Sequence, residues 1–281
     1  MRVLLLTNSI GFGGVEKNVA FIANNLVDKG HTVSIINYNS VNSSIAKAKQ
    51  SFYETVDIHT YEDVNSRFKR LKKLLLTLKV SKKFRPDVIV GFTAFPSYIA
   101  KLVSLLTGVP SVMTERGNPY VTINLKNLPS RIELFFINRS KGGVFQIEGA
   151  AKFFSEKLQS RSTIIPNPIY MKSSIDVEPF CNRTKTIVSV GRLDNYQKRY
   201  DIMIKAFAIF SKKHPDWILQ LYGDGSDQDL IRKWCQEENV LEKVEFKGIS
   251  SCPMNDIKKC SISGVGFTIE KVAYERLNDY L

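Results

Sequence analysis

Apolar segments alternate with amphipathic segments from the start of this 281-residue chain. The apolar or β-branched runs have strand lengths, and in the first half they cover residues 2–7, 32–38, 55–60, 86–92, 110–115 and 142–147. Helical spacing separates most of them, as in residues 15–29 and 95–108. Strands joined through helices pair in parallel, because each connection must cross back over the sheet. The alternation therefore predicts an α/β fold with helices on both faces of a parallel sheet.

The alternation restarts after a segment with little periodicity. Residues 165–184 contain Pro, Ser and Asn without an apolar repeat, which is typical of an interdomain linker. Strand-like and helix-like stretches then follow again over residues 186–193, 199–214, 216–225, 226–240, 243–248 and, as a short helix, 253–260. We therefore expect two tandem Rossmann-like, doubly wound domains, residues 1–168 and 169–281. Ligands in such domains lie at the carboxyl ends of the strands, in the cleft between the domains.

A glycine-rich stretch, GFGGVEKN at residues 11–18, follows the first predicted strand. A dinucleotide fingerprint requires a third glycine where Glu16 stands, and a carboxylate that the next strand lacks. A P-loop is excluded because no Gly-Lys-Ser/Thr follows. The remaining prediction is a turn at a helix N-terminus, where N–H groups and the helix dipole favour a phosphate or a sugar hydroxyl. A tight turn without a ligand stays open as the alternative.

The formal net charge of +13 favours an acidic partner, such as phosphates, nucleic acid or an anionic membrane. The four cysteines have neither CxxC nor metal-site spacing, so we expect reduced thiols in a cytoplasmic protein. The start of the chain does not resemble a signal peptide, and no apolar run approaches the roughly 20 residues of a membrane span. The pair Asp227 and Asp229 falls in a predicted first helical turn, and the histidines are scattered, so we expect neither a metal nor another cofactor.

Two cations, Arg192 and Lys198, flank a predicted strand-to-helix loop in SVGRLDNYQKRYDIMIKAF. They would converge where a phosphate binds, although a pair of solvated surface cations is the simpler alternative. G-R-L, then K, then D and A-F in helical register, resembles the donor site of family 4 glycosyltransferases, which have the GT-B fold.

Other segments resemble the same family in the same order. IIPNPI (164–169) is similar to the end of its first domain, LYGDGSDQDL (221–230) to its G-x-G loop, and VEFKG (244–248) to the strand before its donor-base pocket. GFGGVEKN is similar to its first-domain glycine loop. The resemblance is strongest to bacterial enzymes that build capsular, lipopolysaccharide or other lipid-linked glycans.

The resemblance implies transfer of a sugar from a nucleotide diphosphate, often UDP, to an acceptor hydroxyl with retention and without a metal. Arg192 and Lys198 would be the catalytic residues, because they would neutralise charge on the leaving diphosphate. The implied partners are a nucleotide-sugar donor and a glycan or lipid-linked acceptor. For two of the implied substrate-binding residues, Glu115 and Arg116, a structural role stays open. The full implied substrate-binding set is Gly13, Gly14, Glu115, Arg116, Asn167, Gly223 and Gly225.

A basic segment at residues 67–85 interleaves leucines with cations. The simpler interpretation is an amphipathic helix with Leu71, Leu74, Leu75 and Leu78 packed inward and its lysines solvated. The alternative adds peripheral contact with the anionic inner face of the cell membrane. Nucleic acid is not expected as a partner, because no aromatic platform accompanies the cations.

The resemblance ends near Ser263. The family continues with two glutamates, separated by seven residues, that hold the donor sugar and ribose. Here four residues separate Glu270 from Glu275, and we assign neither glutamate that role. We therefore expect an incomplete second domain. A truncated, catalytically impaired relative stays open beside a short working enzyme.

Overall fold

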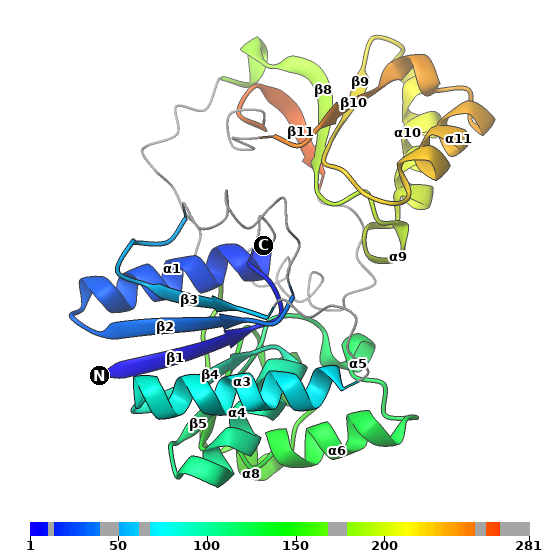
Figure 1. Cartoon of the computed structure of the whole chain (residues 1–281). Helices are drawn as coiled ribbons and strands as arrows, with labels where there is room; N and C mark the ends of the chain where they lie inside the picture. The colour runs from blue at the N-terminus through cyan, green and yellow to red at the C-terminus, as the bar shows by residue number, and fades with distance from the viewer. Residues whose placement is uncertain (11–13, 40–50, 62–67, 168–178, 251–256, 265–281) are drawn as a thin grey trace. The chain divides into compact units, whose positions relative to one another are not determined.

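The computed structural model describes residues 1–10, 14–39, 51–61, 68–167, 179–250 and 257–264 (Figure 1). The chain forms two compact units, Met1–Ile169 and Tyr170–Leu281. Each unit contains one sheet in which every described pairing is parallel. The predicted α/β fold class is therefore confirmed.

The first unit is built on a seven-stranded sheet of order β3-β2-β1-β4-β5-β6-β7. Six of its strands lie within the six predicted runs. The seventh, β7, was not predicted, because three residues are too few to show a period. The strands are β1 (Arg2–Thr7), β2 (Thr32–Asn37), β3 (Asp57–Thr60), β4 (Val88–Phe92), β5 (Ser111–Glu115), β6 (Gly142–Phe145) and β7 (Ser162–Ile164).

Helices cover both faces of this sheet (Figure 1). On one face α1 packs Val19 and Ala23 against β1 and β2. On the other face α3 and α4 pack against β1, β2 and β4, and α6 continues this layer beside α4. The helices of this unit are α1 (Gly14–Asp28), α3 (Lys69–Phe84), α4 (Ala94–Thr107), α5 (Pro119–Thr122), α6 (Leu128–Ile137), α7 (Glu148–Ala151) and α8 (Glu156–Gln159).

The orientation predicted for the leucines of α3 is wrong in part. Leu74 and Leu78 pack toward the sheet as expected, whereas Leu71 and Leu75 are exposed. The reason is that the buried side of the helix is completed by Thr77, which hydrogen-bonds the buried Tyr38 hydroxyl, and by small or β-branched residues further along. None of the helices in the described residues combines the length and apolar character that a membrane span requires.

The second unit has a four-stranded sheet of order β10-β9-β8-β11. Its core joins α10 and α11 with β9 and β10 in one apolar cluster. The helix predicted over residues 253–260 lies partly outside the described residues, and it is wrong at Cys260, which begins a strand paired with β8. The elements are β8 (Thr184–Val190), α9 (Asn195–Lys198), α10 (Tyr200–Lys213), β9 (Ile218–Tyr222), α11 (Gln228–Glu237), β10 (Val244–Gly248) and β11 (Cys260–Gly264), with short 3-10 turns at Phe180–Asn182 and Leu241–Lys243.

Candidate functional site

The strand order of the first unit reverses between β1 and β4, and ligands of open α/β sheets bind at such a reversal. Asn8, just after β1, donates from Nδ2 to Thr93 Oγ1 at 3.1 Å, just after β4. Thr93 has a φ of 71° and a ψ of 177°, a conformation that costs a non-glycine residue about 1–3 kcal/mol. A backbone hydrogen bond of 2.8 Å to the Thr114 carbonyl holds it there. Retained strain of this kind concentrates at functional sites, and no sequence signal pointed to Asn8 or Thr93.

The glycine loop lies partly outside the described residues, and Gly13 is among those left out. Gly14 begins α1, is exposed, and has open space where a Cβ atom would stand. Glu16 in the first turn accepts a 2.6 Å hydrogen bond from the Ser9 hydroxyl. Since a carboxylate already lies at this helix N-terminus, a neutral hydroxyl suits the loop better than a second anion.

Glu115 ends β5 with a buried carboxyl group. Its Oε1 accepts hydrogen bonds from the backbone N–H groups of Arg116, at 2.9 Å, and Gly117, at 3.0 Å. Burial raises the pKa of the Glu115 carboxyl, and the two N–H donors and the Arg116 charge offset this only in part. Glu115 therefore has a demonstrable structural role, closing the turn after β5.

Replacing Glu115 with glutamine is expected to stabilise the first unit at neutral pH. The raised pKa means that the folded state binds its proton more tightly than the unfolded state, so stability falls as pH rises above the ordinary value of 4.5. Glutamine keeps the Oε1 acceptor and carries no charge. Melting curves from about pH 4 to about pH 8 should show that the melting temperature of the glutamine variant exceeds that of the native chain by an amount that grows with pH. A gain in melting temperature that does not change with pH would contradict the raised pKa of Glu115.

Asn167 joins four parts of the first unit. Its Oδ1 accepts from Asn18 Nδ2 at 2.9 Å, Arg116 Nη1 at 3.1 Å and Gln146 Nε2 at 2.8 Å. These donors come from α1 and from the ends of β5 and β6. Three donors on one oxygen fix the orientation of the amide, so its NH₂ group points away from them. The sequence suggested Arg116 and Asn167, but Asn18 and Gln146 were missed because nothing marks them in a linear pattern.

Replacing Asn167 with alanine is expected to destabilise the first unit by about 1–3 kcal/mol, because partly buried donors lose their acceptor. Aspartate at the same position keeps an acceptor oxygen and places a negative charge near Arg116, so it should cost much less. Urea unfolding followed by circular dichroism measures both variants. Equal losses for the two would show that the oxygen is not the stabilising group.

In the second unit, both predicted catalytic cations lie on the connection between β8 and α10. Strand β8 borders the reversal in the order β10-β9-β8-β11. Arg192 follows β8 and is exposed, and Lys198 ends α9 half-buried. A Cβ atom at Gly191 would lie 3.6 Å from Lys198 Cε and 3.7 Å from the Tyr200 hydroxyl, so the lysine stem runs beside this backbone. In the described part of the chain, neither cation has a salt-bridge partner.

The neighbouring Arg199 is neutralised by Asp201. Its Nε and Nη2 bind the carboxylate at 2.9 Å and 2.7 Å, which lowers the pKa of Asp201. The hydroxyl of the buried Tyr200 is hydrogen-bonded to the Ser189 side chain, and burial raises the pKa of Tyr200. Arg199 is therefore occupied by Asp201, whereas Arg192 and Lys198 have no salt-bridge partner among the described residues.

Gly223 and Gly225 bring the loop after β9 close to the loop after β8. A Cβ atom at Gly223 would lie 1.8 Å from the Gly191 carbonyl oxygen, and one at Gly225 would lie 2.3 Å from that of Leu193. The two loops also share a hydrogen bond from the Leu193 N–H to the Asp224 carbonyl at 3.0 Å. Both glycines are therefore required by backbone packing at the site, whether or not they contact a ligand.

The Asp227-Gln228-Asp229 sequence has a structural explanation. Asp227 precedes α11 and its Oδ2 accepts the Asn195 backbone N–H at 2.7 Å. Asn195 in turn accepts the Asp201 N–H at 2.9 Å near the start of α10. These bonds hold the loop that carries Arg192 and Lys198. Over the described ranges, no three His, Cys, Asp or Glu side chains gather as metal ligands do.

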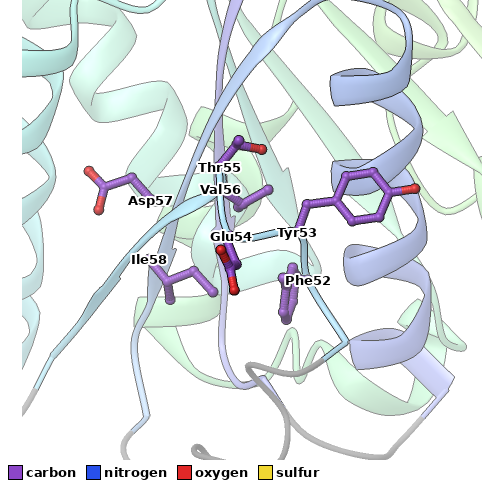
Figure 2. A pocket seen from close by; sticks show the side chains of 7 residues that line it. All are labelled: Phe52, Tyr53, Glu54, Thr55, Val56, Asp57 and Ile58. Atoms are coloured by element: carbon purple, nitrogen blue, oxygen red, sulfur yellow. The ribbon is translucent and has the colours of Figure 1, made fainter.

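A hollow of about 780 Å³ is lined by a segment that runs into β3 and contains none of the predicted site residues. Figure 2 shows its lining, one continuous segment from Phe52 to Ile58, with Tyr53 and Asp57 pointing to opposite sides. Tyr53 is anchored to α1 through a 3.3 Å bond to Asp28. The lining includes two acids and no cation, so it lacks the charge needed to hold a phosphate.

Comparison with known proteins gives related matches for both units. Residues 12–172 match the family described as Glycosyltransferase Family 4, and residues 172–265 match Glycosyl transferases group 1. An uncharacterized glycosyltransferase of Haemophilus influenzae is 24% identical over 83% of this chain and 65% of its own length. The UDP-N-acetylglucosamine--N-acetylmuramyl-(pentapeptide) pyrophosphoryl-undecaprenol N-acetylglucosamine transferase of Chlamydia muridarum is 25% identical over 60% of this chain and 44% of its own length.

Among solved structures, Anabaena HepE in complex with UDP superposes with a TM-score of 0.73 at 16% identity, covering 94% of this chain and 74% of that chain. This likeness concerns the GT-B fold. The chain spans less than two thirds of the length of either curated relative above. The first family match covers more than half of the 281 residues. The chain therefore belongs to glycosyltransferase family 4.

Proposed function

We propose that this protein transfers a sugar from a UDP-linked donor to a glycan or lipid-linked acceptor, with retention at the anomeric carbon. The observation that carries the proposal is the pair of cations, Arg192 and Lys198, at the end of β8 beside loops drawn together by glycines. Two available cations and closely packed backbone suit a diphosphate. Support for UDP comes from the UDP-bound structure of HepE and from the UDP-sugar in the name of the Chlamydia relative.

In the proposed reaction the acceptor hydroxyl attacks the anomeric carbon on the same face that the diphosphate leaves, so that the configuration is retained, and the hydroxyl proton passes to the departing phosphate oxygen. The departing diphosphate gains negative charge, which Arg192 and Lys198 would stabilise without rearranging. Arg192 offers two parallel N–H donors, whereas Lys198 acts as a point charge. Gly223 and Gly225 would keep the loop backbone close to the nucleotide.

The first unit would hold the acceptor or the transferred sugar. Gly13 and Gly14 would present backbone N–H groups to a hydroxyl, since Glu16 makes the neighbouring helix end less suitable for a phosphate. The NH₂ group of Asn167 would donate a hydrogen bond to the bound sugar or acceptor on the side away from its three donors. Arg116 and Glu115 would lie beside that ligand. Peripheral contact of residues 67–85 with an anionic membrane would bring a lipid-linked acceptor within reach.

The experiment is a measurement of UDP release from a panel of UDP-sugars, with and without a polyprenyl-diphosphate-linked saccharide. Release that depends on both donor and acceptor supports the proposal, and proton NMR of the product gives the anomeric configuration. An inverted product would overturn retention alone. Absence of release with every donor, despite UDP binding, would favour the alternative of a catalytically impaired relative that keeps ligand binding. Glu270 and Glu275, which raised that alternative, lie outside the described residues.

A further inference from the structure

Three cations gather toward the amino end of the first sheet, at the far end of the strands from the candidate site. Strand β5 runs from Ser111 at this end to Glu115 at the other. Lys101 comes from α4, Arg139 from the connection between α6 and β6, and Arg161 from the connection between α8 and β7. Three separate segments of the chain therefore each contribute one positive charge.

The packing of α4 on α6 places Lys101 beside Arg139. The rings of Tyr98 in α4 and Phe136 in α6 contact each other, with their centroids 5.8 Å apart. Each helix returns from the carboxyl end of one parallel strand to the amino end of the next, so the two helices run in the same direction. Lys101 and Arg139 each follow one of these rings by three positions, about one helical turn, so they are neighbours as well.

Arg161 reaches the same place through the end of α6. Its Nη2 donates a hydrogen bond to the Asn138 carbonyl at 3.1 Å. Arg139 Nη1 donates to the Phe135 carbonyl, near the same helix end, at 2.7 Å. Burial lowers the pKa of Lys101, and the charges of Arg161 and Arg139 lower it further. The three positive charges are therefore close enough to repel one another.

In the described part of the chain, none of the three cations forms a salt bridge. Glu133 of α6 pairs with Arg70 of α3 at 3.0 Å, and Glu156 at the start of α8 makes no salt bridge within the described ranges. The dipole of α6 contributes only about half a negative charge at this end. Each guanidinium uses one N–H group on a backbone carbonyl, and its other N–H groups are left for a ligand.

Two enclosed hydroxyl groups lie at the same end of the sheet. Ser140 directly follows Arg139, Ser111 begins β5, and both side chains are buried. The Lys141 N–H donates to the Ser111 carbonyl at 2.8 Å, which joins the segments of the two serines. Among the described residues, neither serine Oγ atom has a hydrogen-bond partner. A buried hydroxyl without a partner is destabilising, and an anion oxygen, or a water molecule bridging to one, would satisfy it.

We propose that Lys101, Arg139 and Arg161 form a binding site for a phosphate group, separate from the proposed diphosphate site of the second unit. Two guanidiniums with further N–H donors, one ammonium and two hydroxyl donors suit a small oxyanion of more than one charge. Capping of the α6 carboxyl end explains one bond of each arginine, but it does not explain the half-buried Lys101 beside them. The inference goes beyond the proposed function and does not rest on it.

Calorimetric titration with inorganic phosphate, at constant ionic strength in chloride buffer, tests this site. The full chain carries R192A/K198A in every titration, so that the proposed diphosphate site cannot contribute. We expect K101M and R161Q each to raise the phosphate dissociation constant by about tenfold or more, because each removes a charged partner. The matched control is K79M, at an exposed lysine of α3 in the same unit, and it should leave the constant unchanged. A parallel titration with glycerol 3-phosphate distinguishes a free anion from a phosphate group carried by an organic molecule, which would bind more tightly than inorganic phosphate.

Melting curves at low salt provide a second measurement. Without phosphate, K101M should melt at a higher temperature than the chain with Lys101, because it removes the repulsion among the three cations. Added phosphate should raise the melting temperature of K79M as much as that of its parent, and that of K101M less. Unchanged phosphate affinity in K101M and R161Q would overturn the site, and so would lack of binding by both phosphate compounds. A lower melting temperature of K101M without phosphate would also count against it, because Lys101 would then stabilise the packing of α4 and not a ligand.

Discussion

Replacing either Arg192 or Lys198 with alanine is expected to lower the rate of sugar transfer by roughly 10²–10³-fold, the usual effect of removing one preorganised donor to a developing charge. The structure favours a specific effect, because neither side chain has a salt-bridge partner among the described residues whose loss would disturb the fold. Initial rates of UDP release, at saturating donor and acceptor, measure the change. Melting curves of the variants should match that of the native chain.

The matched control for this prediction is Lys205→Ala. Lys205 is an exposed lysine of α10 in the same unit, so its loss removes the same charge from a different surface. The control should retain the native rate. A rate within threefold of native in both the Arg192 and the Lys198 variant, about 0.7 kcal/mol in activation free energy, would remove the central support for the proposed function.

Replacing Gly223 with alanine is expected to unfold the second unit or to cost it more than about 3 kcal/mol. The new Cβ would lie 1.8 Å from the Gly191 carbonyl oxygen, which cannot move away freely because the Gly191 N–H is bonded to the Tyr222 carbonyl at 2.9 Å. The φ of 144° adds backbone strain for any residue with a side chain. Both tryptophans, Trp217 and Trp234, lie in this unit, so urea unfolding followed by their fluorescence reports on it directly.

Gly248→Ala is the matched control for Gly223→Ala. Gly248 also has a positive φ, of 71°, but a Cβ atom there meets nothing within 4 Å. Its substitution should therefore cost only the backbone strain, about 1–3 kcal/mol. Similar losses at the two glycines would show that strain, and not the close approach of the two loops, makes Gly223 necessary.

Much of the fold could be predicted from the pattern of apolar residues, because strands that are buried on both faces of a parallel sheet have continuous apolar sequences. VLLL in β1 and VIV in β4 are examples, and both lie where the runs predicted strands. The prediction failed where local pattern and packing disagree. Cys260 looked like the end of a helix but pairs in β11, since an edge position beside β8 was open to it. Leu71 and Leu75 looked like core residues, but they lie outside because Thr77 and Tyr38 already fill the inner side of α3.

The candidate site likewise contains residues that the sequence suggested and residues that only the structure revealed. Arg192 and Lys198 lie on the same short strand-to-helix connection, so a linear pattern was enough to suggest them. The Asn167 cluster joins residues up to 149 positions apart, and the Asn8–Thr93 bond spans 85. Hydrogen bonds between loops so distant along the chain leave no periodic signal, and their partners become visible only when the strands that carry them are paired.

The sequence by itself determined the class of fold and the two successive sheets, and it suggested Arg192 and Lys198 as cations for a diphosphate, because these inferences depend on side chains a few residues apart. Only the tertiary structure decided which groups are available. It pairs Arg199 with Asp201, holds a loop through Asp227 and places Lys73 over three aromatic rings, whereas Arg192 and Lys198 have no salt-bridge partner in the described part of the chain. The physical reason is that a charge acts on a ligand only where no closer partner satisfies it, and partners are set by the packing of the whole unit.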